Sequence, residues 1–547
     1  MKSEPIQRQR HKLQKQEQDK ESEKMLGEDL AKWLFNAIRK LLKPALKFGH
    51  ALGVEWMLIL YWVPFSMAGK SNTLWFYIAL SLTVAQLVLN LYCKVKGEKA
   101  RNLIVFATIH IVKNLKGEGA KGIIAKLNTE NVQSISGMVF GKKGGNYVTK
   151  KEQEDGHALV IGGAGSGKSS GIAIPTLMSW KNRAFVIDIK GELYEKTKKV
   201  RGEDSIKVFN PSDEFACGYN PYYVLEMTDD LCSTAHEIAE SIIPLSPDVK
   251  EPMWIKNARD FLCGAILYFY DKGKNFSETM IAIKSQSAKS LVAEVMESGI
   301  QEAITYMSTF ADMADETLSG VFTEVSINIT PFATNKALIR VLGSSSNAIT
   351  PNDLENGNDV FICIEEHKLE QWKTLLTMMV NQFCKFFEQR KNDNNTPILF
   401  MLDEFPRLGK IESVATGLAT LRSKKIEIML YVQSKNQLDM IYGKEQAGSI
   451  CDNCTYKVIL KASEPATQKW CSDLVGTFDK IKKSNSTNAN AFGMGSGSGV
   501  STTTEEKRII KPEEFAYLQD VVCIFPTGYN RITKIKWWED KYFSKYS

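Results

Sequence analysis

The chain has 547 residues, of which 44% are hydrophobic and 24% are charged, and its formal net charge is +6. This length exceeds a single hydrophobic core, and the composition excludes a mainly disordered protein. The small net charge excludes nucleic-acid binding driven by overall charge, so any such contact must be local. The ten cysteines are scattered among apolar neighbours, which is typical of reduced cytosolic thiols.

Residues 1–50 are predicted to be a cytosolic tail followed by a basic amphipathic segment. Residues 1–30 are polar and contain no apolar run, which argues against a signal peptide. From Leu30 onward, apolar residues recur at helical spacing with lysines and arginines between them. This pattern suits a helix lying on anionic membrane lipid, and it suits an ordinary surface helix equally well.

Residues 51–93 are predicted to form a transmembrane hairpin. The run 74–93 is free of charge over about the 20 residues that a bilayer requires, whereas the run 51–69 contains Glu55. Lysines and arginines crowd outside both ends of the pair, which predicts that both termini are cytoplasmic. Two buried core helices are the alternative. Residues 94–150 are predicted to connect the hairpin to the next domain.

The stretch 157–170, HALVIGGAGSGKSS, matches the phosphate-binding loop G-x-x-x-x-G-K-[ST] at every fixed position. In such a loop, backbone N–H groups point at phosphate oxygens, the lysine reaches the β and γ phosphates, and the next hydroxyl ligates Mg²⁺. A glycine-rich turn that binds nothing is the alternative. The predicted ligands are ATP and Mg²⁺, and the predicted binding residues are Gly162, Gly163, Ala164, Gly165, Ser166, Gly167, Lys168, Ser169 and Ser170.

Short apolar strands alternate with helical patterns on both sides of a long helical stretch. This alternation predicts an α/β domain, made of residues 151–222 and 343–547, with a mostly parallel sheet covered on both faces. Residues 223–342 have apolar residues at helical spacing and are predicted to be an all-helical insertion. The strands before and after it are predicted at residues 158–161, 183–189, 205–209, 359–364, 398–402, 426–432, 455–460, 521–525 and 531–538.

Residues 397–405, PILFMLDEF, are an apolar run that ends in two carboxylates. A buried strand of this kind delivers both acids to the mouth of a phosphate site. Asp403 is predicted to hold Mg²⁺ together with Ser169, and Glu404 is predicted to polarise the attacking water. Gln433 follows the next strand and could sense the γ-phosphate, or it could simply be a loop residue.

Two further stretches carry weaker signals. Residues 483–504 are rich in Ser, Asn, Gly and Thr and are predicted to be a mobile loop. Cys451 and Cys454 form a lone C-x-x-C pair, for which a zinc or redox role remains an alternative to simple burial.

The chain resembles the VirD4/TraG family of coupling proteins, the membrane-bound ATPases of bacterial conjugation and type IV secretion. The resemblance rests on the order and spacing of several motifs over nearly the whole chain. They are HALVIGGAGSGKSSGIAIPTL, VIDIKGELY, the YNP of residues 219–221, Trp254 with Ala258, LFMLDEF, LYVQSKNQL, and RII with PEEF at residues 508–515.

The resemblance implies a RecA-like P-loop NTPase that works as a homo-hexamer in the bacterial inner membrane, with ATP bound between neighbouring subunits. It also implies that Arg422 is the arginine finger of the adjacent site, although an ordinary surface arginine is the alternative. The implied partners are the relaxase or relaxosome, single-stranded DNA, the proteins of the secretion channel and membrane lipid. An FtsK-like DNA translocase and a docking receptor that does not hydrolyse nucleotide are the competing functions.

Overall fold

The computed structural model describes residues 129–130, 135–245, 251–343, 347–392, 396–488 and 497–546. The chain divides into two compact units, Met1–Ala120 and Lys121–Ser547, and every described residue belongs to the second. The predicted tail and transmembrane hairpin, residues 1–93, therefore lie outside the described residues. None of the helices among the described residues combines the length and apolarity that crossing a membrane requires.

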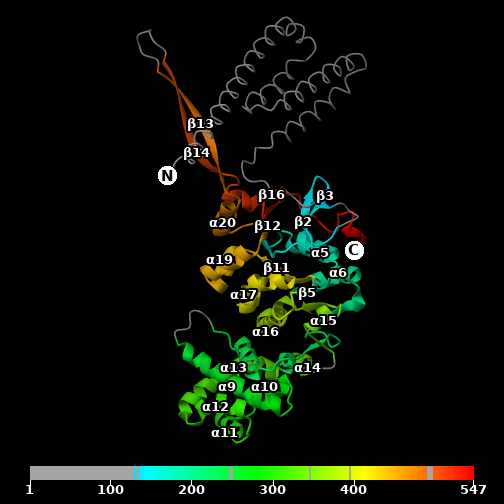
Figure 1. Cartoon of the computed structure of the whole chain (residues 1–547), viewed down its shortest axis with the longest axis vertical. Helices are drawn as coiled ribbons and strands as arrows, with labels where there is room; N and C mark the ends of the chain where they lie inside the picture. The colour runs from blue at the N-terminus through cyan, green and yellow to red at the C-terminus, as the bar shows by residue number, and fades with distance from the viewer. Residues whose placement is uncertain are drawn as a thin grey trace, which may run out of the picture. The chain divides into compact units, whose positions relative to one another are not determined.

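A nine-stranded sheet forms the centre of the second unit (Figure 1). Its order is β16-β15-β12-β4-β11-β10-β5-β9-β6. The strands from β12 to β6 run parallel, β15 is antiparallel to β12, and β16 is antiparallel to β15. The strands are β4 (Ala158–Gly162), β5 (Ala184–Asp188), β6 (Ile206–Phe209), β9 (Asp359–Cys363), β10 (Ile398–Leu402), β11 (Ile426–Val432), β12 (Tyr456–Lys461), β15 (Val521–Phe525) and β16 (Gly528–Ile532).

The central strands are buried on both faces, because their side chains alternate between two hydrophobic cores. In β4, Leu159 and Ile161 belong to one core, whereas Ala158 and Val160 belong to the other. Near-continuous apolar runs of this kind are typical of parallel strands covered by helices on both sides. The structure thus confirms the predicted α/β class and the mostly parallel sheet.

Helices cover both faces of the sheet, as Figure 1 shows. One face carries a helical turn of residues Ser169–Ala173 that continues into α5 (Ile174–Ser179), together with α6 (Glu192–Arg201). The opposite face carries α16 (Leu369–Glu388), α17 (Glu412–Thr420), α18 (Lys435–Tyr442), α19 (Lys444–Asn453) and α20 (Pro465–Val475).

The stretch between β6 and β9 is helical along most of its length, as the sequence predicts. It joins the sheet domain through the YNP motif: the Tyr219 hydroxyl donates to the side-chain oxygen of Gln382 on α16, and the Gln382 amide donates to the Pro221 carbonyl at 3.0 Å. The helices are α7 (Tyr223–Glu226), α8 (Leu231–Ile242), α9 (Pro252–Asp271), α10 (Phe276–Lys284), α11 (Ala288–Met296), α12 (Gln301–Ala311), α13 (Asp315–Thr334), α14 (Lys336–Gly343) and α15 (Asn352–Glu355).

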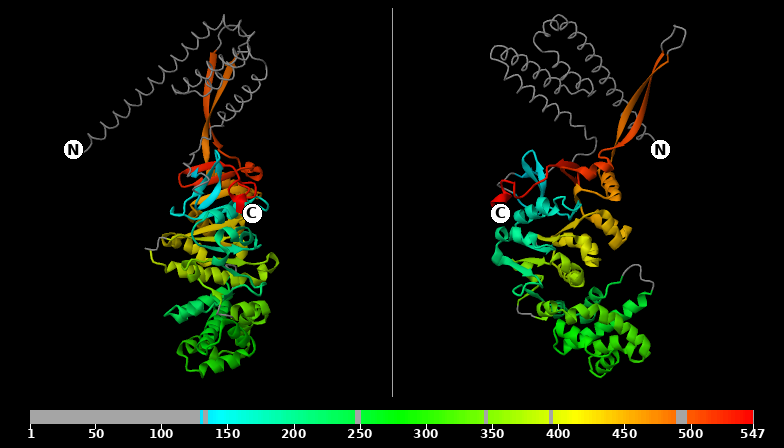
Figure 2. Two further views of the ribbon diagram at one scale, coloured as in Figure 1. Left: turned by 90° about the vertical axis from the view of Figure 1, so that its right-hand side faces the viewer. Right: turned by 180° about the vertical axis from the view of Figure 1, so that it is seen from behind.

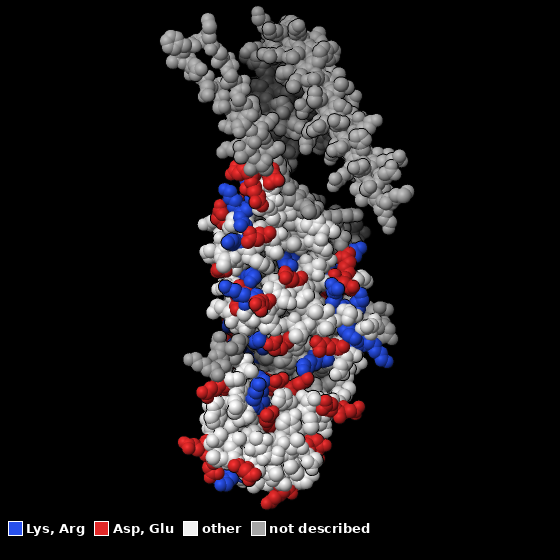
Figure 3. Space-filling view, turned by 60° about the vertical axis from the view of Figure 1, so that its left-hand side comes forward, with Lys and Arg blue, Asp and Glu red and all other residues white. Residues whose placement is uncertain are grey.

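The surface carries charge of both signs. On the face drawn in Figure 3, basic and acidic side chains intermingle over the sheet domain, whereas the charged side chains at the helical end are mainly acidic. This distribution agrees with the small net charge of the whole chain, which is +6.

The prediction of a mobile loop at residues 483–504 was wrong for the part that the structure describes, residues 483–488 and 497–504. These residues belong to the antiparallel strands β13 (Thr477–Asn488) and β14 (Gly497–Arg508), which extend away from the sheet (Figure 2), and residues 489–496 lie outside the described residues. The backbone pairs in an unbroken register from Thr477↔Arg508 to Asn488↔Gly497. Polar composition indicates that little apolar surface is buried, but it does not prevent backbone pairing, and threonine is itself a strand-favouring residue.

The last strand was predicted at residues 531–538, but β16 begins at Gly528 and ends at Ile532. The chain reverses directly after β15, and Phe525 pairs with Gly528 across a two-residue turn. Gly528 has a φ of +132°, a conformation that favours glycine, so the turn residue itself begins the strand.

The range 94–150 was predicted to be a connector, but its final part folds into the sheet domain. The hairpin of β2 (Met138–Lys143) and β3 (Asn146–Lys150), to which β1 (Thr129–Glu130) adds a short strand, packs its apolar side chains into the same core as α5. Lys142 exchanges two backbone hydrogen bonds with Thr533, at 2.9 and 2.7 Å, so the hairpin is joined to the C-terminal segment.

A buried ion pair fixes the edge of the sheet. Arg201 at the end of α6 contacts both carboxylate oxygens of Asp359 on β9, at 2.6 and 2.8 Å, and also donates to the carbonyls of Leu177 and Trp180. Because the side chains are only 3% and 0% exposed, removing one partner leaves an uncompensated buried charge.

We therefore expect Arg201→Met to lower the free energy of unfolding by about 3–5 kcal/mol. Urea unfolding of the detergent-solubilised protein, followed by tryptophan fluorescence, measures this change. Lys289→Met is the matched control, because its partner Asp315 lies 3.1 Å away in a pair that is more than three-quarters exposed. Equal losses from both substitutions would contradict the expectation.

Candidate active site

The predicted phosphate loop has the backbone geometry that phosphate binding needs. Gly165 and Gly167 have φ values of +66° and +94°, where other residues are strained. A Cβ on Gly162 would lie 2.3 Å from the Ser166 hydroxyl, so this position also favours glycine. The Gly163 N–H donates to the Lys461 carbonyl at 2.9 Å, which ties the loop to the end of β12.

Lys168 folds back over the loop. Its ammonium group donates to the Gly162 carbonyl at 2.7 Å and lies 3.6 Å from a carboxylate oxygen of Glu404. The side chain is only 7% exposed, so its charge is confined to the loop and its surroundings. The structure thus places Lys168 and Glu404 together, as the two sequence motifs require.

Asp403 and Glu404 follow β10 at the carboxyl edge of the sheet, beside the end of β5. The Asp403 carboxyl is buried, and burial raises its pKa to about 7, with smaller contributions from the charges of Glu404 and Asp188. Glu404 has a φ of +47°, a left-handed conformation that costs energy for a residue with a side chain. Such strain is common where a side chain must be aimed at a reaction centre.

Gln433 lies at this site rather than in an uninvolved loop. It follows β11, which pairs with both β4 and β10, and its side-chain amide donates to Glu404 at 2.9 Å. This bond orients the carboxylate whose other oxygen faces Lys168. The adjacent strands β4, β11 and β10 therefore bring three of the predicted residues to one place.

The oxygen donors at this site fit a magnesium ion. Asp403 offers a buried carboxylate, and Ser169, directly after Lys168, offers a hydroxyl; Mg²⁺ prefers such hard oxygen ligands. Among the described residues there is no group of three or more His, Cys, Asp or Glu side chains that could hold a metal ion. A magnesium ion here would therefore take its other ligands from phosphate oxygens and water.

Arg422 lies apart from the phosphate loop. It is exposed in the helical turn Leu421–Lys424, directly before β11, whereas the loop follows the carboxyl end of the neighbouring parallel strand β4. The seven residues of β11 span about 23 Å, so Arg422 cannot reach the nucleotide site of its own subunit.

Residues 113–547 match the family described as Type IV secretory system Conjugative DNA transfer. The chain belongs to this family. The finding confirms the family that the sequence motifs indicate.

Two relatives each match nearly three quarters of the chain. The chain is 25% identical to Protein VirD4 of Agrobacterium fabrum over 432 residues, which are 74% of the chain and 63% of the relative. It is 26% identical to the conjugal transfer protein TraG of Escherichia coli over 444 residues, which are 72% of the chain and 68% of that relative. The chain thus spans less than two thirds of the VirD4 protein that it matches.

Solved structures of the plasmid coupling protein TrwB have the same fold. The complex with the ATP analogue ADPNP aligns with a TM-score of 0.55 at 17% identity, covering 76% of this chain and 97% of TrwB. The complex with ADP and Mg²⁺ aligns with a TM-score of 0.53 at 18% identity, covering 70% and 85%. These matches show that the described part of the chain shares the fold of TrwB.

In this member of the family, His157 plays a part that the sequence analysis did not foresee. It directly precedes β4 and is fully buried. Its Nδ1 atom accepts a hydrogen bond from the Ile428 N–H at 3.0 Å, and its Nε2 atom lies 2.9 Å from the Leu418 carbonyl. The ring is therefore neutral with the proton on Nε2, and burial lowers its pKa to about 4.

This lowered pKa predicts an acid sensitivity. Between pH 6.5 and 4 the unfolded chain binds a proton at His157 that the folded chain does not, so stability falls as the pH falls through this range. The difference amounts to about 3 kcal/mol at the low end. We expect His157→Gln to flatten the pH dependence of the urea midpoint between pH 6.5 and 4 relative to wild type. Parallel curves for the two proteins would contradict this.

Lys534 and Asp188 are two further neighbours of the site without a role in the sequence analysis. The Lys534 ammonium donates to the Ser166 carbonyl at 2.8 Å, which braces the phosphate loop from the C-terminal segment. No motif surrounds Lys534, so the sequence offered no signal for it.

Asp188 ends β5 within the VIDIKGELY motif, and burial raises its pKa to about 6. The VIDIKGELY motif could therefore have indicated from the sequence that Asp188 lies at the site.

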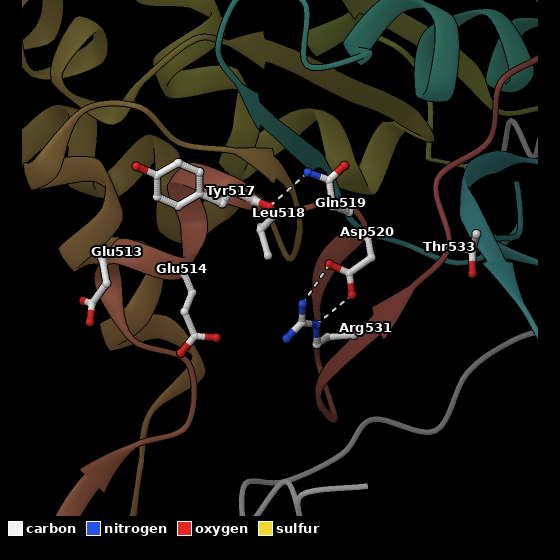
Figure 4. A pocket seen from close by; sticks show the side chains of 8 residues that line it. All are labelled: Glu513, Glu514, Tyr517, Leu518, Gln519, Asp520, Arg531 and Thr533. Atoms are coloured by element: carbon white, nitrogen blue, oxygen red, sulfur yellow. Dashed lines mark hydrogen bonds and ion pairs between the residues drawn. The ribbon is translucent and has the colours of Figure 1, made fainter. Parts of the chain in front are cut away.

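A shallow cavity of about 590 Å³ lies at the same edge of the sheet, beyond β12 (Figure 4). Its lining includes the carboxylates of Glu513, Glu514 and Asp520, and its one arginine, Arg531, is paired with Asp520 at 2.7 Å. This acidic lining would repel a polyphosphate. The glycine loop, and not this cavity, is therefore the phosphate site.

The C-x-x-C pair shows no sign of zinc or redox chemistry. Cys451 and Cys454 are both free and buried, and burial raises the pKa of the Cys451 thiol to about 11 and that of Cys454 further. A thiol must ionise to bind metal or to attack a disulfide, and the raised pKa values of these thiols oppose ionisation at neutral pH.

Proposed function

We propose that this protein is a membrane-anchored ATPase coupling protein of conjugation or type IV secretion. It recruits relaxase-bound DNA and drives or licenses its transfer into the channel by hydrolysing ATP. The observation that carries the proposal is the meeting of Lys168, Glu404 and Gln433 at the carboxyl ends of adjacent strands. A site that only stored nucleotide would not need a carboxylate held in this position.

The residues suggest how ATP would be hydrolysed. The loop N–H groups and Lys168 would hold the phosphates, and Asp403 with Ser169 would hold Mg²⁺, which would neutralise phosphate charge. Glu404 orients the attacking water and takes its proton, while Gln433 keeps the carboxylate in place. The TrwB complexes with ADPNP and with ADP and Mg²⁺ support these ligands for a protein of the same fold.

We infer that the working form is a homo-hexamer with ATP sites between subunits. The support is the position of Arg422, which is exposed and lies at the opposite end of β11 from the site of its own chain. An arginine supplied by the adjacent subunit would neutralise the charge that develops on the transferred phosphoryl group. Hydrolysis would then require assembly.

The partners follow from the family and from the surface. We propose that the helical insertion contacts a protein substrate, the relaxase or relaxosome, because its charged side chains in Figure 3 are mainly acidic and would repel DNA. Apolar side chains are exposed there as well, with Met253 at 71% and Ile327 at 63%. Single-stranded DNA and the proteins of the channel are the remaining proposed partners.

We propose that residues 51–93 anchor the protein in the bacterial inner membrane as two spans, with both termini in the cytoplasm and the preceding basic segment on the lipid. The support is the pair of apolar runs and the lysines and arginines outside both ends. Cysteine labelling from the two sides of inverted and right-side-out vesicles would test this topology.

The function itself is tested by Mg²⁺-dependent ATP hydrolysis of the detergent-purified full-length protein, with and without single-stranded DNA, beside Lys168→Ala. We expect activity per subunit that rises with protein concentration and with DNA, and none in the variant. If the wild-type protein hydrolysed no ATP under any assembly condition, the result would favour the docking receptor. Stimulation by duplex DNA alone would favour an FtsK-like translocase.

A further inference from the structure

His157 joins two parts of the subunit that would serve two different ATP sites. It directly precedes β4, the strand that leads into the phosphate loop. Its ring bonds to the Leu418 carbonyl on α17 and to the Ile428 N–H on β11. These two residues flank the turn that carries Arg422.

The bond to Leu418 acts on the end of a helix. Leu418 lies in the last turn of α17, where carbonyl groups lack regular helical partners, so the His157 N–H satisfies one of them. The turn with Arg422 begins directly after α17, and Leu421 within it is fully buried. Fixing the last turn of α17 therefore fixes the direction in which the Arg422 side chain leaves the surface.

Other contacts also hold this turn, and two of them limit the effect that loss of His157 can have. Arg390, just after the end of α16, donates to the Lys424 carbonyl at 2.9 Å, and Lys425 pairs with Asp155 at 2.8 Å in a partly exposed ion pair. Because these contacts remain without His157, its loss should shift the turn without unfolding it. His157 is the one of the three that is fully buried and that bonds to both sides of the turn.

We propose that His157 is a positioning residue that sets Arg422 for the ATP site of the neighbouring subunit. The proposal rests on the proposed function, in which Arg422 acts on the adjacent site. His157 acts through Leu418 and does not touch nucleotide. The loop of its own subunit is held separately, by the bonds of Gly163 to Lys461 and of Ser166 to Lys534.

Two substitutions separate the bonds of the ring. In His157→Gln the amide nitrogen can take the place of Nε2 and donate to Leu418, whereas the shorter side chain of His157→Asn keeps only the acceptor for Ile428. We expect His157→Asn to lower kcat on the order of 100-fold, as displaced catalytic groups do, with the KM for ATP unchanged. We expect His157→Gln to lower kcat by less than about 5-fold.

The decisive test mixes subunits of the full-length protein by co-expression with two affinity tags. His157→Asn subunits keep an intact phosphate loop, and Lys168→Ala subunits keep an intact Arg422. Their mixed assemblies should recover ATP hydrolysis at least about 10-fold above either variant alone. Assemblies of His157→Asn with Arg422→Ala should not recover, because both lack a placed arginine.

Mixing Arg422→Ala with Lys168→Ala is the control for the proposed function. If this pair does not recover activity, Arg422 does not act between subunits, and both proposals fall. If it recovers but His157→Asn with Lys168→Ala does not, His157 serves its own phosphate loop, and only the present inference is overturned.

A second variant covers the case in which His157→Asn does not fold. A Cβ on Gly417 would lie 2.8 Å from the Leu421 side chain, so Gly417→Ala should push the same turn without touching His157. Gly417→Ala subunits should recover ATP hydrolysis when they are mixed with Lys168→Ala subunits. They should not recover it when they are mixed with Arg422→Ala subunits. Recovery with Arg422→Ala would overturn the inference.

Discussion

Glu404→Gln is expected to reduce the rate of ATP hydrolysis by a factor of about 10²–10⁴ while the protein still binds nucleotide. The amide keeps the shape of the side chain and can still accept the hydrogen bond from Gln433, but it cannot take a proton from water. Lys168 and the loop remain intact, so the phosphates keep their ligands. Single-turnover hydrolysis and the binding of a fluorescent ATP analogue measure the two effects separately.

Glu366→Gln is the matched control for that substitution. Glu366 also follows a strand, β9, at the carboxyl edge of the sheet, but it is half exposed and pairs with Arg407 at 2.6 Å. Its hydrolysis rate should stay within about twofold of wild type, because no reacting group lies beside it. If Glu404→Gln behaved like this control, the role of Glu404 as the base would have to be abandoned.

Arg422→Ala is expected to lower kcat by a factor of about 10³ or more without weakening nucleotide binding to the isolated subunit. The Arg422 guanidinium lies outside the nucleotide site of its own subunit. The loss of ATP hydrolysis is therefore expected only in assemblies, where a neighbouring subunit depends on this arginine. The measurement is kcat at saturating ATP over a range of protein concentrations, with Lys424→Ala in the same turn as the control. An Arg422→Ala variant that kept its kcat, or a Lys424→Ala control whose kcat fell as much, would contradict the arginine-finger role.

The parts of the fold that the sequence predicted are those with regular burial. The run of β10 is apolar at every position and lies in the sheet as predicted, because parallel strands between two layers of helices leave no position for polar side chains. The phosphate loop was equally clear, since its glycines are fixed by φ angles and by close approach. Local chemistry dictates such positions, so one sequence suffices to find them.

The remaining features depend on contacts between distant residues. The partner of Lys534 is 368 residues away in the sequence, and nothing near Lys534 marks it. His157 belongs to the most recognisable motif of the chain, yet its ring bonds to Leu418 and Ile428, which only the fold brings to it. The hairpin β13–β14 was missed because its stability lies in backbone pairing, which composition does not reveal.

The same hairpin gives the subunit a long lever arm. A strand of 12 residues spans about 40 Å, and at its base Arg508 is anchored to Asp473 on α20 at 2.5 Å. The N-terminal part of α20 is itself bonded to the chain just after Gln433, because the Lys435 N–H donates to Thr467 at 3.0 Å. A rotation of α20 by about 10° would therefore sweep the far end of the hairpin through about 7 Å. Small adjustments beside the phosphate loop would therefore be amplified at the far end of the hairpin.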